Sequence, residues 1–260
     1  MLKTRMSQSG FSLIELAIGL VIVATLLSAL LVPLATQLDQ RRSSETQKLL
    51  DAAREALLGY VIGQERFPCP ASTASNGQEA FVVGPPAGTA ANGMCAQYRG
   101  FLPAVTLGLS PLDRNGYQTD GFGGDANRLR YAVADVDFDA NAKVYTATGK
   151  MKAIGMNLVS SANNRLWVCS AASTNDASCS AGVALANGNA IAVVLSVGKN
   201  GFDTVRVPDA DEAENLDMTN TNRVFVSRGQ SDQAGNEFDD LAVWISPNIM
   251  ISRLAAAGKL

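Results

Sequence analysis

The hydrophobic and polar positions divide the chain into an apolar helical start and a longer body of short strands. Residues 16–32 carry no charged side chain, and a single acid, Glu15, stands just before them. Together with the flanking residues 11–14, this run reaches the roughly 20 residues that a membrane-spanning helix needs. Lys3 and Arg5 precede it, which favours a cytoplasmic N-terminus.

The helical pattern continues beyond the apolar run. Leu49, Ala53 and Leu57 recur at steps of four and mark one face, whereas charged residues such as Glu45 and Lys48 take the other. The stretch F-P-C-P at residues 67–70 ends this pattern. We therefore predict one long helix from Phe11 to about Ile62, whose second half lays its apolar face on a sheet.

The remaining chain alternates strand-like runs with turns rich in Gly, Asn and Asp, so the sheet should be mainly antiparallel. Ser246 and Pro247 have the residue types of an N-cap and a first helical position, which predicts a short C-terminal helix closing near Gly258. The expected class is α+β. The predicted strands are Ala80–Val83, Arg128–Val136, Val144–Thr148, Leu166–Cys169, Ala190–Val197, Arg223–Val226 and Leu241–Ile245.

Composition excludes several function classes. The chain has no histidine, which removes His-based acid–base catalysis and His-ligated zinc. Its formal net charge is −3, so binding to nucleic acid through phosphate neutralisation is not expected. The segment G-F-G-G-D-A at residues 121–126 matches a dinucleotide-binding pattern, but it precedes a strand-like run and does not open a helix. No GxSxG or P-loop motif occurs, and we expect a protein that is not an enzyme.

Four cysteines follow the apolar segment: Cys69, Cys95, Cys169 and Cys179. They form no CxxC pair, and an even number in this position favours two disulfides in an exported domain. The pairing Cys69–Cys95 and Cys169–Cys179 closes two short loops and is the one we favour. The other two connectivities remain open, as do four free thiols in a cytoplasmic protein.

Glu15 is difficult to explain as part of a plain membrane anchor, because a carboxylate at membrane depth costs several kcal/mol unless it is paired. A cleaved signal peptide also predicts no acid at the start of its apolar core. The stretch G-F-S-L-I-E at residues 10–15 resembles the cleavage and methylation signal of type IV pilins and type II secretion pseudopilins.

This resemblance implies that a prepilin peptidase cuts the chain between Gly10 and Phe11, and that Phe11 is then N-methylated. It implies that Glu15 pairs with the N-terminal amine of a neighbouring subunit during assembly, which supplies the missing counter-charge. Residues 1–10 would then be a leader, residues 11–35 a transmembrane and assembly helix, and residues 36–260 a pilin-like domain in the periplasm or at the cell surface.

The partners that the resemblance implies are the peptidase, other pilin or pseudopilin subunits, the bacterial inner membrane and an assembly platform. Whether the filament is a pilus or a secretion pseudopilus, and whether the subunit is major or minor, stays open. The competing hypothesis is a singly anchored periplasmic binding protein that forms no filament.

Carboxylates cluster late in the chain, and we weigh three interpretations of them. A paired-acid glycosidase lacks the aromatic residues of a sugar cleft. A calcium site suits oxygen ligands and the resemblance, because exported pseudopilins can hold Ca²⁺ in a C-terminal loop. A solvated acidic loop is the remaining alternative. The candidate calcium ligands are Asp203, Asp209, Asp211, Asp217, Asp239 and Asp240.

Overall fold

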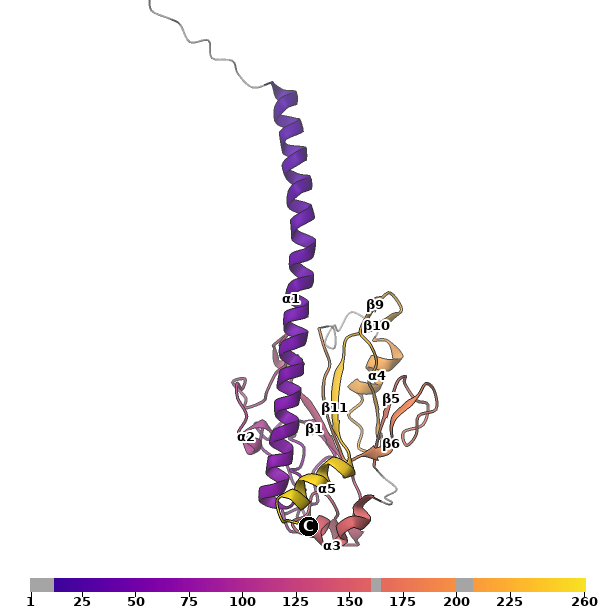
Figure 1. Cartoon of the computed structure of the whole chain (residues 1–260). Coiled ribbons are helices and arrows are strands. Elements are labelled where there is room, and N and C mark those ends of the chain that lie inside the picture. The colour runs from indigo at the N-terminus through magenta and orange to yellow at the C-terminus, as the bar shows by residue number, and fades with distance from the viewer. Residues whose placement is uncertain (1–11, 160–164, 200–207) are drawn as a thin grey trace, which may run out of the picture. The chain divides into compact units, whose positions relative to one another are not determined.

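The computed structural model describes residues 12–159, 165–199 and 208–260, without the side chains of residues 27–35 and 159. Its contacts divide the chain into two compact units, residues 1–42 and 43–260. Helix α1 (Leu13–Gln64) contributes to both units (Figure 1). The rest of the described secondary structure lies in the second unit.

A four-stranded antiparallel sheet forms the centre of the second unit, in the order β1-β2-β7-β11. The central strands β2 and β7 place Tyr131 opposite Val194. Helix α5 follows β11 directly and lies beside the C-terminal end of α1 in Figure 1, where Arg253 and Glu55 are 3.1 Å apart. The bounds of these elements are β1 (Arg99–Phe101), β2 (Arg130–Val133), β7 (Ala192–Ser196), β11 (Leu241–Ile245) and α5 (Pro247–Ala256).

A second, three-stranded sheet has the order β6-β5-β8, and its β5–β8 pair is the one parallel pairing among the described strands. Two small hairpins, β3–β4 and β9–β10, and several short helices complete the unit. Their bounds are β3 (Asp137–Asp139), β4 (Ala142–Lys143), β5 (Leu166–Cys169), β6 (Ala184–Ala190), β8 (Val224–Val226), β9 (Ser231–Gln233), β10 (Asn236–Phe238), α2 (Ala104–Leu107), α3 (Lys150–Ile154), α4 (Ala210–Leu216), and the 3₁₀ turns Asp125–Asn127 and Gly155–Val159.

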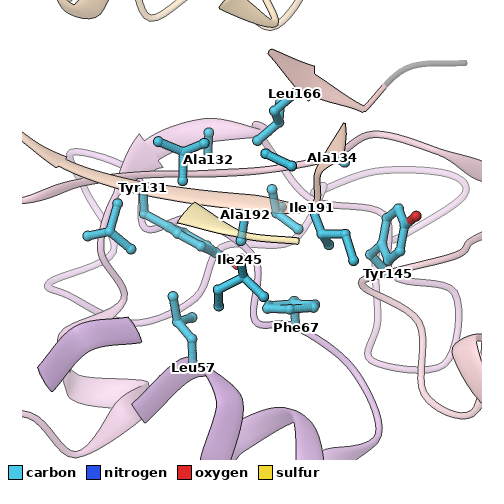
Figure 2. Close-up of a cluster of buried hydrophobic side chains, with 14 of the residues drawn as sticks. Leu57, Phe67, Tyr131, Ala132, Ala134, Tyr145, Leu166, Ile191, Ala192 and Ile245 are labelled. Atoms are coloured by element: carbon cyan, nitrogen blue, oxygen red, sulfur yellow. The ribbon is translucent and has the colours of Figure 1, made fainter. Parts of the chain in front are cut away.

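The core of the second unit lies between the second half of α1 and the central sheet. Figure 2 shows Leu57 of α1 facing Ile245 of β11 and Phe67, and all three side chains are at most 1% exposed. Burying side chains of this size stabilises the fold by roughly 2 kcal/mol each. The apolar face predicted for the helix therefore does pack on the sheet, through Ala53 and Leu57.

Several elements match their predicted positions. Strands β5 and β11 have the predicted bounds, α1 ends at Gln64, and the side chain of Ser246 caps α5 by accepting the backbone N–H of Ile249. The mixed α+β class and the mainly antiparallel pairing are confirmed.

Other strand predictions were wrong or too long. Residues 144–148 form turns, because their backbone groups bond to several different segments: Val144 donates to Val136, the carbonyl of Tyr145 accepts from Phe67, and Thr148 donates to Ala90. The predicted strand 128–136 shortens to β2, and the predicted strand 80–83 is reduced to a single bridge at Phe81.

Among the residues that the structure describes, no helix is both long enough and apolar enough to cross a membrane. The predicted membrane segment, residues 11–35, includes Phe11 and the side chains of residues 27–35, which lie outside the described set.

Candidate functional site

The candidate site begins at the first turn of α1. Ser12 directly precedes the helix, and its carbonyl oxygen accepts the backbone N–H groups of Glu15 at 3.0 Å and Leu16 at 3.1 Å. Glu15 is the acidic residue of this first turn, and its side chain is exposed. The predicted cleavage and methylation residues, Gly10 and Phe11, lie outside the described residues.

The first turns of α1 expose apolar side chains on every side of the helix. The large ones are at least 52% exposed within the chain: Leu13, Ile14, Leu16, Ile18, Leu20, Val21, Ile22, Val23 and Leu26. A helix that is apolar all round is buried in its working state, either in other protein or in lipid. An exposed apolar surface this continuous marks an interaction site.

Two disulfides, Cys69–Cys95 and Cys169–Cys179, are present in the structure, with sequence separations of 26 and 10 residues. This is the connectivity that the short loops favoured. The first joins the segment that follows α1 to the loop before β1, and the second closes the loop between β5 and β6. On the chain-entropy estimate, each stabilises the fold by roughly 3 kcal/mol.

The predicted calcium ligands have separate structural roles in the part of the chain that the structure covers. Asp209 caps α4 by accepting the N–H of Asp211. One Asp211 oxygen accepts the N–H of Ala172, and the other lies 2.6 Å from Nε of Arg228. Asp217 accepts bonds from the side chain of Asn222 and from Thr219. These three carboxylates hold loops and helix ends together, and they do not converge around a common point where a cation could bind.

Two further candidate ligands are adjacent in sequence but contact different partners. Asp239 accepts the backbone N–H of Lys199, and Asp240 accepts a bond from Asn215 at 2.8 Å. Burial, with the neighbouring carboxylates of Asp239 and Glu212, raises the pKa of Asp240 to about 8. A calcium ion bound at Asp240 would therefore have to displace a proton near neutral pH.

Within the described residues, no group of three or more His, Cys, Asp or Glu side chains is arranged to hold a metal ion. Asp203 lies outside those residues, and calcium binding by this region stays a prediction.

If Ca²⁺ binds, the full chain in detergent should melt at a higher temperature in millimolar Ca²⁺ than in chelator, because a ligand of the folded state stabilises it. Mg²⁺ should do less, since it dehydrates reluctantly. Identical melting curves in calcium and in chelator would mean that this acidic region binds no calcium.

Sequence reasoning missed a buried cation that joins the two sheets. Arg99 of β1 donates to the carbonyl oxygens of Asn222, Val224 and Glu214, and its guanidinium lies 4.1 Å from the ring centre of Phe225. Burial lowers the pKa of Arg99 to about 10. The signal in the sequence was a basic residue within a strand. Burying its charge is costly unless backbone oxygens accept its hydrogen bonds.

Comparison with known proteins bears on the N-terminal part of the chain. Residues 5–31 match the family model of the prokaryotic N-terminal methylation motif, which is the signal of type IV pilins and pseudopilins. The chain has no significant match among curated proteins or among solved structures. The match covers Gly10, Phe11 and Glu15, the residues that carry the resemblance.

Proposed function

We propose that this protein is a structural subunit of a type IV pilus or of a type II secretion pseudopilus. The methylation motif over residues 5–31 carries the proposal, and the exposed apolar start of α1 supports it. A prepilin peptidase cuts the chain between Gly10 and Phe11, Phe11 becomes the methylated N-terminus, and the subunit has no catalytic role.

In this proposal the first part of α1, within residues 11–35, lies in the bacterial inner membrane with its N-terminus on the cytoplasmic side. Residues 36–260 face the periplasm, or the cell surface once a filament has formed. On assembly the helix exchanges lipid for the helices of neighbouring subunits, and Glu15 receives the N-terminal ammonium of one of them. A paired charge in that apolar surrounding is tolerated where an unpaired one is not.

Processing provides the test. In cells with an active prepilin peptidase, mass spectrometry of the membrane fraction should find an N-terminus at methylated Phe11. Gly10→Val should keep the leader, because a branched side chain crowds the cut site. Ser9→Ala, one residue earlier, is the matched control and should be cut normally. Wild-type protein that keeps its leader would overturn the proposal and favour the singly anchored binding protein.

A further inference from the structure

Five Asn-Gly pairs occur in the sequence, and the fold holds them to different degrees. Asparagine before glycine is prone to spontaneous deamidation, because glycine has no side chain to hinder attack and its backbone is conformationally free. Four of the pairs lie in the described residues and begin at Asn76, Asn92, Asn115 and Asn187. The fifth, which begins at Asn200, lies outside them.

The side chain of Asn92 is held by three hydrogen bonds. Its Oδ1 accepts the backbone N–H groups of Thr89 at 2.8 Å and Met94 at 3.1 Å. Its Nδ2 donates to the carbonyl oxygen of Ala87 at 2.9 Å. The carboxamide carbon cannot turn toward the backbone nitrogen of Gly93 until bonds of this set break.

The side chain of Asn115 is exposed, and its carboxamide makes no hydrogen bond with any residue that the structure describes. The backbones of the two pairs are otherwise comparable. The N–H of Gly116 donates to the carbonyl of Asp113 at 3.1 Å. The N–H of Gly93 donates to the carbonyl of Thr89 at 2.7 Å. The hydrogen bonds of the carboxamide are therefore the main difference between the two pairs.

The other two described pairs are restrained through their backbones. The N–H of Asn76 donates to the hydroxyl of Tyr117 at 3.1 Å, and the carbonyl of the buried Gly77 accepts the N–H of Val105 at 3.0 Å. The pair that begins at Asn187 lies within strand β6, which is paired with β5. Among the described pairs, the one in the exposed turn is the least restrained.

We propose that Asn115 is a site of spontaneous deamidation in the folded protein. The backbone nitrogen of Gly116 attacks Cγ of Asn115 and forms a C–N bond. The bond from Cγ to the side-chain nitrogen breaks, and ammonia leaves with the proton of the attacking N–H. Water then opens the five-membered succinimide ring at either carbonyl, which gives aspartate or isoaspartate.

The modification acts on a turn that contacts a second segment. Gly116 has a φ of +84°, and a Cβ on it would lie 2.5 Å from the carbonyl oxygen of Asn76. Isoaspartate adds a methylene to the main chain beside this close contact. Aspartate adds a second carboxylate two residues from Asp113, whose Oδ1 already accepts the N–H of Asn115. The reaction thus changes the charge or the main-chain length at a packed turn.

The experiment follows deamidation in the full 260-residue chain, kept folded in detergent at mildly alkaline pH with both disulfides intact. Samples are taken over time, quenched in acid, reduced and digested, and tandem mass spectrometry measures the conversion of amide to carboxylate at each asparagine. Asn115 should react about 30-fold faster than Asn92. This factor corresponds to two hydrogen bonds of about 1 kcal/mol each that must break before Asn92 can react.

Unfolding provides the first control. In denaturant with both disulfides reduced, the hydrogen bonds of Asn92 are lost, and the two rates should converge. Asn115→Gln is the matched variant, because it keeps a carboxamide but cannot form the five-membered ring. It should abolish the signal at residue 115 and leave the rate at Asn92 unchanged.

Three results would overturn the proposal. The first is equal deamidation of Asn115 and Asn92 in the folded chain. The second is a rate difference that persists in denaturant, since the fold would then not cause it. The third is deamidation of Asn115→Gln at the wild-type rate, since Gly116 would then not be the attacking residue. None of these results depends on leader cleavage or on filament formation.

Discussion

Glu15→Val should leave the chain inserted and cleaved after Gly10, yet lower its association with neighbouring subunits by on the order of 100-fold, the factor that corresponds to about 3 kcal/mol. Insertion survives because valine makes the segment more apolar. Association falls because a neighbour's ammonium then enters an apolar surrounding without a counter-charge, and breaking a buried ion pair costs about 3–5 kcal/mol.

The measurement is the fraction of tagged subunit that sediments with filaments, relative to the amount of cleaved subunit in the membrane. Counting subunits, not filaments, keeps the assay valid for a minor subunit. Thr25→Val, a polar-to-apolar change further along the same helix, should be incorporated normally. Equal incorporation of Glu15→Val and wild type would mean that Glu15 does not pair with a neighbour.

The parts of the fold that could be predicted are those that local chemistry determines. Helix α1 follows from an apolar run without proline before Pro33, and α5 follows from a Ser-Pro start whose serine does cap the helix. Strands β5 and β11 could be predicted because each is a short apolar run with polar residues on both sides in the sequence. In these cases the residues of the element itself carry the signal.

The parts that could not be predicted depend on distant partners. The run 144–148 has strand composition, but its backbone groups bond to three separate segments instead of one strand. The acidic residues 209–217 predict a loop, but residues 210–216 form helix α4. Its Asp211 and Glu214 accept the backbone N–H groups of Ala172 and Ser173, some forty residues earlier, which sequence alone does not reveal. Closeness in sequence did not bring the carboxylates together, because side-chain directions depend on the helix that carries them.

The candidate site divides in the same way. Glu15 can be proposed from the sequence because its motif is contiguous, and the structure places it in the first turn of α1. The calcium set spans residues 203–240, and its described members lie on helix α4, at the two ends of that helix and between β10 and β11, so separate segments would have to converge. The residue types of these segments do not determine whether their carboxylates meet in the fold.

Loss of the Glu79 carboxylate should have the largest effect on the stability of the second unit. Arg66 is 4% exposed, and its two terminal nitrogens each lie 2.7 Å from an oxygen of Glu79. Glu79 also accepts the backbone N–H of Cys69 and the hydroxyl of Tyr60. Glu79→Gln leaves a buried guanidinium without its counter-charge, so we expect unfolding to become easier by about 3 kcal/mol or more.

Thermal unfolding followed by circular dichroism, with both disulfides intact, should show a drop in Tm of roughly 10 °C for Glu79→Gln. The exposed pair between Glu55 and Arg253 is the matched control: its atoms approach to 3.1 Å, but both side chains are more than half exposed. Glu55→Gln should cost less than about 1 kcal/mol. Adding Arg66→Met to Glu79→Gln should recover much of the loss, because the uncompensated charge is then gone. If Glu79→Gln and Glu55→Gln melt alike, the buried pair does not hold the loop to the end of α1 as the geometry indicates.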